Sequence, residues 1–461
     1  MAGIFKAYDV RGKYPDKINN KLAKNIGYDI AEVFSSKKIL LCRDARIGSE
    51  DLMNGLMQGF KFFDKEIIII DAGVTTTPMF YFVLQKGDFD FGIMITASHD
   101  PKDYCGMKLW RKEKGILHPV SYGTGEEIVE RLSNGNNIAV DNQKVSIDKK
   151  NYEKDYFDYL VNLSKINDFI VEQSTIKVVV DYSNGTAGIN SELLKKTANI
   201  IELNKTQDGD FPCHEPNPLL KDSQKQISEK IKQENADFGI IFDGDGDRIV
   251  FLNEKGEQVQ TEKIVSLDVA EMIKEGKDVK SVVETLNMSE DLAKDLATRN
   301  VNLFKTRVGY VFVREKAMQE NSAITAEKST HFAYRETGFT DSAILTYLYI
   351  IKKYYLFKKD NPNLSFNDMT KQANIVHVNV ENVIEIESDK IDSVLKKVFD
   401  YYSNKANRYE ELDGYSFYFE DYWFNIRKSN TMPEIKVTIE AKNKDKEKEI
   451  FKQLLEILNK N

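Results

Sequence analysis

Residues 237–248 read DFGIIFDGDGDR, an apolar run that ends in a loop of alternating aspartate and glycine. A short apolar run bounded by turn residues is typical of a buried strand. The same order recurs in KKILLCRD (37–44), KEIIIIDAG (65–73), FDFGIMITA (89–97) and IKVVVDYSNGTAG (176–188). Helical patterns follow such runs, as in EDLMNGLMQGFKFF (50–63) and INSELLKKTA (189–198). This alternation predicts α/β domains with parallel or mixed sheets, whose sites lie at the carboxyl ends of strands.

The chain from residue 373 onward follows a different pattern. ANIVHVNVEN (373–382) alternates like a half-buried strand, and IDSVLKKVFDYYSNKA (391–406) is helical. DGYSFYFEDYWFNIRKSNTMPEIKVTIEA (413–441) predicts an antiparallel meander, and DKEKEIFKQLLEILNK (445–460) an amphipathic closing helix. We therefore expect three similar mixed α/β domains, over residues 1–150, 151–257 and 258–372, and a C-terminal α+β domain over 373–461.

Composition narrows the class of protein. The 461 residues suffice for about three or four domains. A net charge of −8, with 65 Lys and Arg spread along the chain, argues against nucleic acid as a partner. The cysteines Cys42, Cys105 and Cys213 lie far apart, which indicates a reducing compartment. No signal-peptide core is evident, and no apolar run approaches the roughly 18 residues of a membrane span, so we expect a cytoplasmic protein.

The loop at Asp243, Asp245 and Asp247 places three carboxylates side by side. Such a concentration of negative charge favours a cation, and hard oxygen ligands suit Mg²⁺. A polar turn and an EF-hand are the alternatives, since Glu254 falls at loop position 12. An EF-hand needs flanking helices, whereas here an apolar strand precedes the loop and RIVFL (248–252) follows it. The pattern therefore favours a divalent-metal site on a strand–loop–strand unit.

Four further motifs are ambiguous when each is taken alone. Ser98 follows a strand in MITASHDPKDYCGMKLW (94–110), but it lacks the flanking glycines of a serine hydrolase. RKSNTMP (427–433) suits a phosphate or is an ordinary turn. AEKSTH (326–331) offers polar groups to sugar hydroxyls or caps a loop. KAYDVRG (6–12), taken alone, is better explained by a surface salt bridge than by a functional arginine.

Together these motifs resemble the α-D-phosphohexomutase superfamily, most closely its bacterial phosphomannomutase/phosphoglucomutase branch. The resemblance rests on YDVRG (8–12), TASHDPKDYCGMK (96–108), DGDGDR (243–248), AEKSTHF (326–332) and RKSNTMP, with support from CRDARIGS (42–49), DAGVTTTPMFYF (71–82) and GDFPCHEPNPL (209–219). It covers the whole chain in the right order. It implies four domains around a central active-site cleft, with small-molecule hexose phosphates as partners and a monomer or dimer as the assembly.

The resemblance also implies residue roles. Ser98 would carry a phosphoryl group and, with Asp243, Asp245 and Asp247, bind Mg²⁺. Lys108 would be the general base or acid, which requires a depressed pKa. The other implied catalytic residues are Arg11, His99 and Arg248. Tyr8, Glu327, Ser329 and His331 would bind the sugar, and Arg427, Ser429, Asn430 and Thr431 the phosphate that is not transferred.

The implied reaction interconverts hexose 6-phosphate and hexose 1-phosphate through a hexose 1,6-bisphosphate, which serves as intermediate and activator. Mannose is the preferred sugar and glucose is possible. A phosphoglucosamine mutase is disfavoured because its opening motif differs from AYDVRG (7–12). A catalytically inactive relative that binds sugar phosphates, and a haloacid-dehalogenase phosphatase, are alternatives from other classes. The second would leave Ser98 without a role.

The sequence departs from the family pattern at six positions. Asp100 and Cys105 replace asparagines, Ala326 and Thr330 replace glycines, Tyr310 replaces a histidine, and Met432 replaces a glutamate. Asp100 adds negative charge beside a phosphoserine, so we expect a neighbour that offsets it. These departures bear on the preferred sugar rather than on the chemistry.

Overall fold

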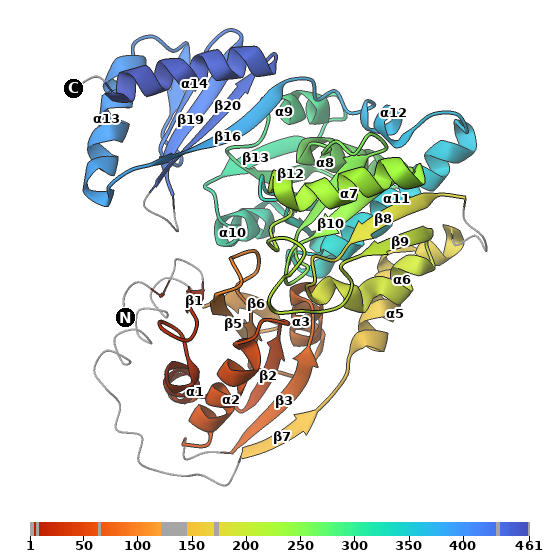
Figure 1. Ribbon diagram of the computed structural model, residues 1–461, viewed down its shortest axis with the longest axis vertical. Helices are drawn as coiled ribbons and strands as arrows, with labels where there is room; N and C mark the ends of the chain where they lie inside the picture. Colours follow the sequence, from red (N-terminus) through yellow and green to blue (C-terminus); the bar gives the residue numbers. More distant parts are fainter. Residues whose placement is uncertain are drawn as a thin grey trace. The chain divides into compact units, whose positions relative to one another are not determined.

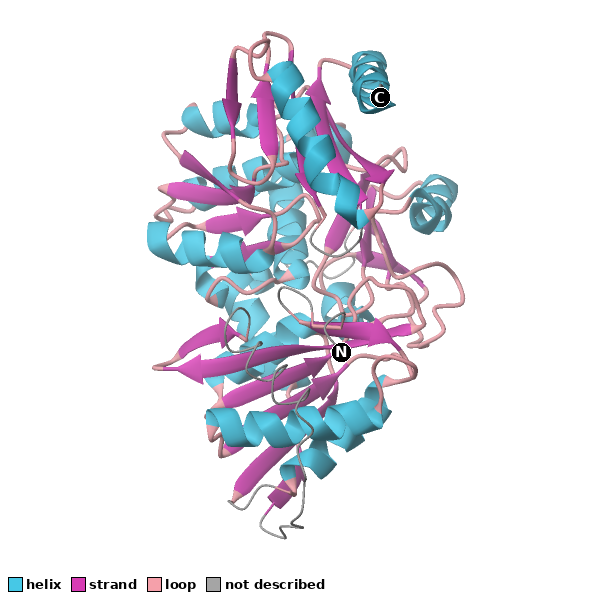
Figure 2. Cartoon of the chain, turned by 90° about the vertical axis from the view of Figure 1, so that its left-hand side faces the viewer, coloured by secondary structure: helices cyan, strands magenta, loops and turns pink. Residues whose placement is uncertain are grey.

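The computed structural model describes residues 4–5, 9–62, 66–120, 145–169, 175–429 and 434–459. The chain, whose helices and strands are drawn in Figures 1 and 2, divides into two compact units. The first comprises Met1–Val259 with Ser329–Met369, and the second Gln260–Lys328 with Thr370–Asn461.

The first unit begins with a mixed sheet of seven strands. Its order is β1-β5-β4-β2-β3-β7, with β6 paired to β5. Strands β4, β2, β3 and β7 run parallel, and β5 is antiparallel to β4 and β1. The strands are β1 (Val10–Lys13), β2 (Lys38–Arg43), β3 (Ile67–Val74), β4 (Phe91–Ile95), β5 (Tyr104–Glu113), β6 (Ile116–Pro119) and β7 (Val145–Lys149).

Helices cover both faces of this sheet. Alternate residues of a strand point to opposite faces. Phe91, Ile93 and Ile95 share a core with apolar residues of α1 (Asn20–Phe34) and α2 (Ser49–Phe60). A Cβ at the intervening Gly92 would meet Phe80 and Leu84 of α3 (Thr77–Lys86), so α3 covers the other face. The apolar runs are continuous because both faces are buried.

A second mixed sheet of the first unit has the order β11-β10-β8-β9. Ile227 and Ile231 of α7 pack on one of its faces with Val179, Ile241 and Val250. Phe366 stacks on Phe238 with ring centroids 4.3 Å apart. The strands are β8 (Lys177–Asp181), β9 (Asn199–Leu203), β10 (Phe238–Phe242) and β11 (Ile249–Asn253). The helices here are α5 (Glu153–Ser164), α6 (Ser191–Lys195), α7 (Lys221–Glu234), α11 (Ala343–Asp360) and α12 (Phe366–Thr370), and a short strand β15 (Phe332–Tyr334) precedes α11.

The second unit contains a parallel sheet in which β12 (Ser281–Thr285) lies between β13 (Asn302–Thr306) and β14 (Ile324–Ala326). Its helices are α8 (Thr261–Lys274), α9 (Glu290–Ala297) and α10 (Tyr310–Glu320). Strand, helix and strand follow one another from β12 through α9 to β13.

The C-terminal sheet is fully antiparallel, with the order β16-β20-β19-β18-β17. Helices α13 (Ile391–Tyr402) and α14 (Lys444–Asn459) lie together over one face (Figure 1). Their Val398 and Leu454 share a core with Phe424 and Val437 of the sheet. The strands are β16 (Val378–Glu385), β17 (Arg408–Glu410), β18 (Tyr415–Tyr418), β19 (Tyr422–Lys428) and β20 (Glu434–Ala441).

The predicted fold class of three α/β domains and a C-terminal α+β domain is confirmed, with two local corrections. The helix expected over 189–198 covers only Ser191–Lys195, because the chain must turn to enter β9 at Asn199. The strand expected over 373–382 begins at Val378, because the N–H groups of Val376 and His377 donate to Asp291 Oδ2 instead of to a sheet. The residue ranges expected for the four domains stay a prediction. None of the helices in the described part of the chain is long and apolar enough to cross a bilayer.

Candidate active site

Ser98 lies in a tight turn just after β4. The N–H of Asp100 donates to the carbonyl of Ala97 at 3.0 Å, and Ser98 has a φ of 53°. A residue with a side chain loses about 1–2 kcal/mol in this left-handed conformation. The N–H of Ser98 donates to Thr96 Oγ1 at 2.8 Å, and the side chain is 1% exposed. The fold therefore holds the serine in a strained position, which is common at functional sites.

The aspartate loop lies against this serine. Ser98 Oγ donates to Asp243 Oδ2 at 2.9 Å, although the two residues are 145 positions apart. The loop joins β10 to β11, so the strand–loop–strand unit is confirmed and the EF-hand alternative is excluded. A Cβ at Gly244 would lie 2.7 Å from the Ser98 carbonyl oxygen, so only glycine allows the two loops to approach this closely.

The aspartates form a buried group suited to a cation. Asp243, Asp245 and Asp247 are all 0% exposed, and their carboxylate oxygens lie within 4.8 Å of one another. Burial, and then the two neighbouring carboxylates, hold the pKa of Asp243 well above its ordinary value. Asp245 Oδ1 is buried without a hydrogen-bond partner among the residues that the structure describes. These oxygens, with Ser98 Oγ, fit a hard divalent cation such as Mg²⁺.

Lys108 lies beside the aspartate loop. It stands on β5 opposite Met94 of β4, and its Nζ lies 2.5 Å from Asp247 Oδ2 and 3.1 Å from Asp245 Oδ2. Burial lowers the pKa of Lys108, but the two carboxylates outweigh burial and raise the pKa well above its ordinary value. Asp245 and Asp247 thus oppose the depressed pKa expected for Lys108, and its role as general base or acid stays a prediction. The structure stabilises the ammonium form.

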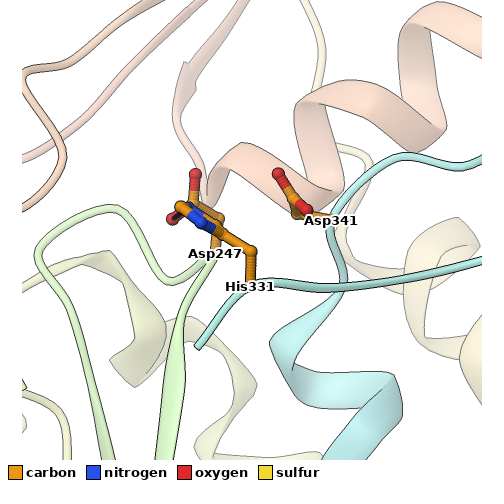
Figure 3. A group of neighbouring side chains, drawn as sticks. All are labelled: Asp247, His331 and Asp341. Carbon is orange, nitrogen blue, oxygen red and sulfur yellow. Dashed lines mark ion pairs between the residues drawn. The ribbon is translucent and has the colours of Figure 1, made fainter. Parts of the chain in front are cut away.

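A histidine from a later segment of the same unit completes this side of the loop (Figure 3). His331 Nε2 lies 3.2 Å from Asp247 Oδ1 and 3.2 Å from Arg248 Nε. Ser329 Oγ lies 2.9 Å from His331 Nδ1. Burial lowers the pKa of His331, but Asp341 and Asp247 outweigh it and raise the pKa. The structure thus joins the predicted residues Arg248, Ser329 and His331 to Asp247.

Arg11 and His99 flank the serine turn. Arg11 Nη1 donates to the Ala97 carbonyl at 3.2 Å and to Asp100 Oδ2 at 3.3 Å. Arg11 is therefore the neighbour that offsets Asp100. His99 Nδ1 lies 3.4 Å from Ser98 Oγ. Burial, together with Arg248 and Arg11, holds the pKa of His99 well below its ordinary value, so the imidazole is neutral.

The remaining predicted residues fall into two groups. Glu327, Arg427 and Ser429 are buried in the second unit. Arg427 Nη2 donates to Glu381 Oε2 at 3.1 Å, and the same oxygen accepts from Asn287 Nδ2 at 3.0 Å. Tyr8, Asn430 and Thr431 lie outside the described residues.

Two residues that contact the site were not predicted. Thr77 Oγ1 donates to Asp245 Oδ2 at 2.6 Å, and Arg46 donates to the Ser98 carbonyl at 2.8 Å. Both lie in motifs that supported the family resemblance, DAGVTTTPMFYF and CRDARIGS. The run of threonines before Pro78 is typical of a helix start and gives no sign of a partner 168 positions later.

Models of one family match the chain in four consecutive segments. They describe the phosphoglucomutase/phosphomannomutase α/β/α domains I, II and III, at residues 2–135, 154–256 and 261–365, and the C-terminal domain at 376–457.

Relatives match along the whole length. A phosphomannomutase of Methanocaldococcus jannaschii is 31% identical over 466 residues, covering 99% of this chain and 97% of the relative. A phosphoglucomutase/phosphomannomutase family protein of Burkholderia thailandensis shares the fold with a TM-score of 0.83, at 21% identity, with 99% of this chain and 98% of that one covered. An Aspergillus fumigatus N-acetylphosphoglucosamine mutase, solved with GlcNAc-6P and magnesium, has a TM-score of 0.58 at 14% identity, with 99% and 96% covered.

Three observations point to the same family. Its models match four consecutive domains, a relative is 31% identical over nearly the whole chain, and Ser98 contacts the aspartate loop. The chain belongs to the four-domain phosphoglucomutase/phosphomannomutase family of the α-D-phosphohexomutase superfamily.

Proposed function

We propose that this protein is a phosphohexose mutase that interconverts hexose 6-phosphate and hexose 1-phosphate through phosphoserine 98 and a 1,6-bisphosphate, with mannose as the preferred sugar. The observation that carries the proposal is the 2.9 Å contact between Ser98 Oγ and Asp243 Oδ2, with Lys108 on the two other aspartates. One buried region of the first unit thus contains three groups that the reaction needs. Ser98 can accept a phosphoryl group, the aspartate loop can hold a divalent cation, and Lys108 can carry a proton.

In the proposed reaction a sugar hydroxyl takes the phosphoryl group from Ser98. A P–O bond to the sugar oxygen forms as the bond to Ser98 Oγ breaks, and the proton of the sugar hydroxyl ends on Ser98 Oγ, which becomes a hydroxyl. Mg²⁺, held by Ser98 and the three aspartates, would neutralise charge on the phosphoryl oxygens. Lys108 is placed to exchange a proton with the sugar oxygen. Its ammonium form, which Asp245 and Asp247 favour, is the acid required when the second phosphate leaves the sugar for Ser98.

Other groups supply charge and orientation. The guanidinium of Arg11 donates to the serine turn, and Arg248 Nε lies 3.8 Å from Asp243 Oδ2 of the aspartate loop. The neutral His99 lies with Nδ1 3.4 Å from Ser98 Oγ, and is proposed to orient that oxygen. Glu327, Ser329 and His331 are proposed to bind sugar hydroxyls, and Arg427, Ser429, Asn430 and Thr431 the phosphate that is not transferred.

The names of relatives support a hexose phosphate as substrate. The Methanocaldococcus relative is named phosphomannomutase, and the Aspergillus relative was solved with GlcNAc-6P and magnesium. Glucose phosphate and glucosamine phosphate are the competing substrates. An inactive sugar-phosphate-binding relative would be expected to lose Ser98, an aspartate or Lys108, and this chain retains them all. The expected assembly, a monomer or dimer, and the expected location in the cytoplasm both stay predictions.

One experiment tests the activity and ranks the sugars. Mutase rates on mannose 1-phosphate, glucose 1-phosphate and glucosamine 1-phosphate should be measured side by side with Mg²⁺ and catalytic glucose 1,6-bisphosphate. We expect the highest kcat/KM with mannose. Intact mass should show a species heavier by one phosphate that Ser98→Ala lacks together with nearly all turnover. Full turnover in Ser98→Ala would overturn the proposal.

A further inference from the structure

A buried arginine that was not among the predicted site residues donates hydrogen bonds to the loop that follows Ser98. Arg46 is 2% exposed, and its side chain donates to four backbone carbonyls. Nη2 donates to Ser98 at 2.8 Å and Asp100 at 2.6 Å. Nη1 donates to Pro101 at 2.7 Å and Tyr104 at 2.9 Å. Because a guanidinium is planar and rigid, these contacts fix the four carbonyls relative to one another.

Arg46 is itself held on its other sides. Its Nε lies 3.3 Å from Asp44 Oδ2, and its backbone N–H donates to Asp44 Oδ1 at 3.0 Å. Ser49 Oγ donates to that same oxygen at 2.5 Å. The ring of Phe211 lies 5.0 Å from the guanidinium carbon, a cation–π distance. The four Nη N–H groups therefore each donate to a carbonyl, whereas Nε faces Asp44 in an ion pair and makes no hydrogen bond with the described residues.

The hydrogen bonds of Arg46 orient the backbone at Ser98. A trans peptide points its N–H away from its C=O, so the pull on the Ser98 carbonyl turns the His99 N–H away from Arg46. On the side of the aspartate loop, the Ser98 carbonyl lies against Gly244. A Cβ at Gly244 would come within 2.7 Å of the carbonyl oxygen. These two constraints orient the Ser98–His99 peptide, which follows a residue with a φ of 53° whose Oγ donates to Asp243.

We propose that Arg46 is a positioning residue for phosphoryl transfer at Ser98. It holds the turn in the conformation that places Oγ on the aspartate loop, and Phe211 connects it to the segment that follows β9. The inference rests on the proposed phosphoserine chemistry. Arg46 makes no contact with Ser98 Oγ in the described structure, so its effect on transfer acts through the loop.

The test measures transfer to Ser98 directly. Dephosphorylated wild type and Arg46→Lys are mixed with saturating glucose 1,6-bisphosphate and Mg²⁺, and Ser98 phosphorylation is followed by intact mass. Lysine keeps the charge but has three donors on one atom and cannot span four carbonyls. We expect phosphorylation and kcat to fall at least tenfold, while KM and the shift in Tm that Mg²⁺ produces change less than twofold. A role confined to stability would leave the rate at saturation unchanged.

Controls separate the possible failures. Arg43→Lys is the matched control, because Arg43 ends β2 near Arg46 and pairs with the exposed Glu50; its rate should equal that of wild type. In Arg46→Ala, added methylguanidinium should restore part of the rate. If Arg46→Lys does not fold, the decision rests on the phosphorylation rate of Arg46→Ala measured with and without methylguanidinium. A wild-type rate in the deciding variant overturns the inference. A wild type that takes no phosphate on Ser98 overturns the proposed function instead.

Discussion

Asp100 Oδ2 lies 3.3 Å from Arg11 Nη1, so the carboxylate next to the serine turn is paired with a cation of the N-terminal strand. The same guanidinium contacts Asp9 Oδ2 at 2.8 Å and the Ala97 carbonyl at 3.2 Å. Arg11 thus already faces two carboxylates before any phosphoryl group is attached to Ser98. A phosphoserine would have to share Arg11 with them.

The first prediction follows from this competition. Asp100→Asn keeps the shape and removes one negative charge two residues from Ser98. A partly exposed ion pair is worth up to about 1 kcal/mol, which is roughly fivefold in an equilibrium constant. We expect the phosphoserine to survive up to about fivefold longer in buffer than in wild type, as measured by intact mass over time. Asp103→Asn, in the same loop but paired with the exposed Lys13, is the control. Faster phosphate loss in Asp100→Asn would contradict the prediction.

The second prediction concerns the aspartate loop. Asp245→Asn removes one of three charges around the cation site, so Mg²⁺ should no longer stabilise the fold. Binding to the folded state at one hundred times Kd is worth about 2.7 kcal/mol. We expect Mg²⁺ to raise the Tm of wild type over that in EDTA, and to leave the Tm of Asp245→Asn nearly unchanged with turnover abolished. Glu254→Gln, at position 12 of the rejected EF-hand, should respond like wild type. An equal Tm shift in Asp245→Asn would show that the ion binds elsewhere.

The elements of the fold were predictable where burial leaves a local pattern. Strands β2, β4, β8 and β10 are largely buried apolar runs, and β3 begins with four isoleucines, so the sequence shows all five. Strand β5 was not predicted, because it mixes Lys108, Trp110 and Arg111 and so shows neither a continuous nor an alternating pattern. Its register opposite β4, which brings Lys108 to the aspartates, is a tertiary property.

The site was predictable only in part. The aspartate loop is visible because its carboxylates are adjacent in sequence. The role of Ser98 came from the family resemblance, since its partner Asp243 is 145 residues away. The pKa of Lys108 could not be predicted, because it depends on carboxylates 137 and 139 positions later. Arg46 was not singled out, because its acceptors are backbone carbonyls, which every residue carries.

The third prediction concerns pH. His214 Nε2 lies 3.2 Å from Asp181 Oδ2, and Nδ1 lies 2.8 Å from the Glu215 carbonyl. Burial lowers the pKa of His214, but the hydrogen bond and charge of Asp181 outweigh burial and raise it. A raised folded-state pKa stabilises the fold fully below the unfolded value of about 6.5, and that stability is lost as pH rises through the folded-state pKa.

We therefore expect the free energy of unfolding of His214→Gln to fall below that of wild type by about 1.5–3 kcal/mol near pH 5.5, the worth of a hydrogen bond to a charged group. The difference should shrink towards pH 9. Urea unfolding at both pH values measures it. A difference that grows with pH would mean that the neutral imidazole is the stabilised form.

The last prediction separates binding from transfer, and its residue belongs to the second unit. Arg427 is 4% exposed, and Glu381 Oε2 holds its Nη2 at 3.1 Å. Asn287 donates to the same oxygen, which keeps the carboxylate in place. Arg427 Nε is buried without a hydrogen-bond partner among the described residues. The guanidinium is thus pre-oriented and retains a donor for a phosphate oxygen.

Arg427→Lys keeps the charge and loses the two-pronged contact with phosphate. A charge-assisted hydrogen bond is worth about 1.5–3 kcal/mol, or about 10- to 150-fold in affinity. We expect KM for the sugar phosphate to rise in that range, while Mg²⁺ shifts the Tm as in wild type and saturating bisphosphate still phosphorylates Ser98. Because the 1,6-bisphosphate must stay bound while it reorients, its release during turnover should also increase, which product analysis detects. Arg408→Lys, on the exposed strand β17, is the control. Wild-type kinetics in both Arg427→Lys and Arg427→Ala would show that the strand end at Arg427 is a turn without a part in substrate binding.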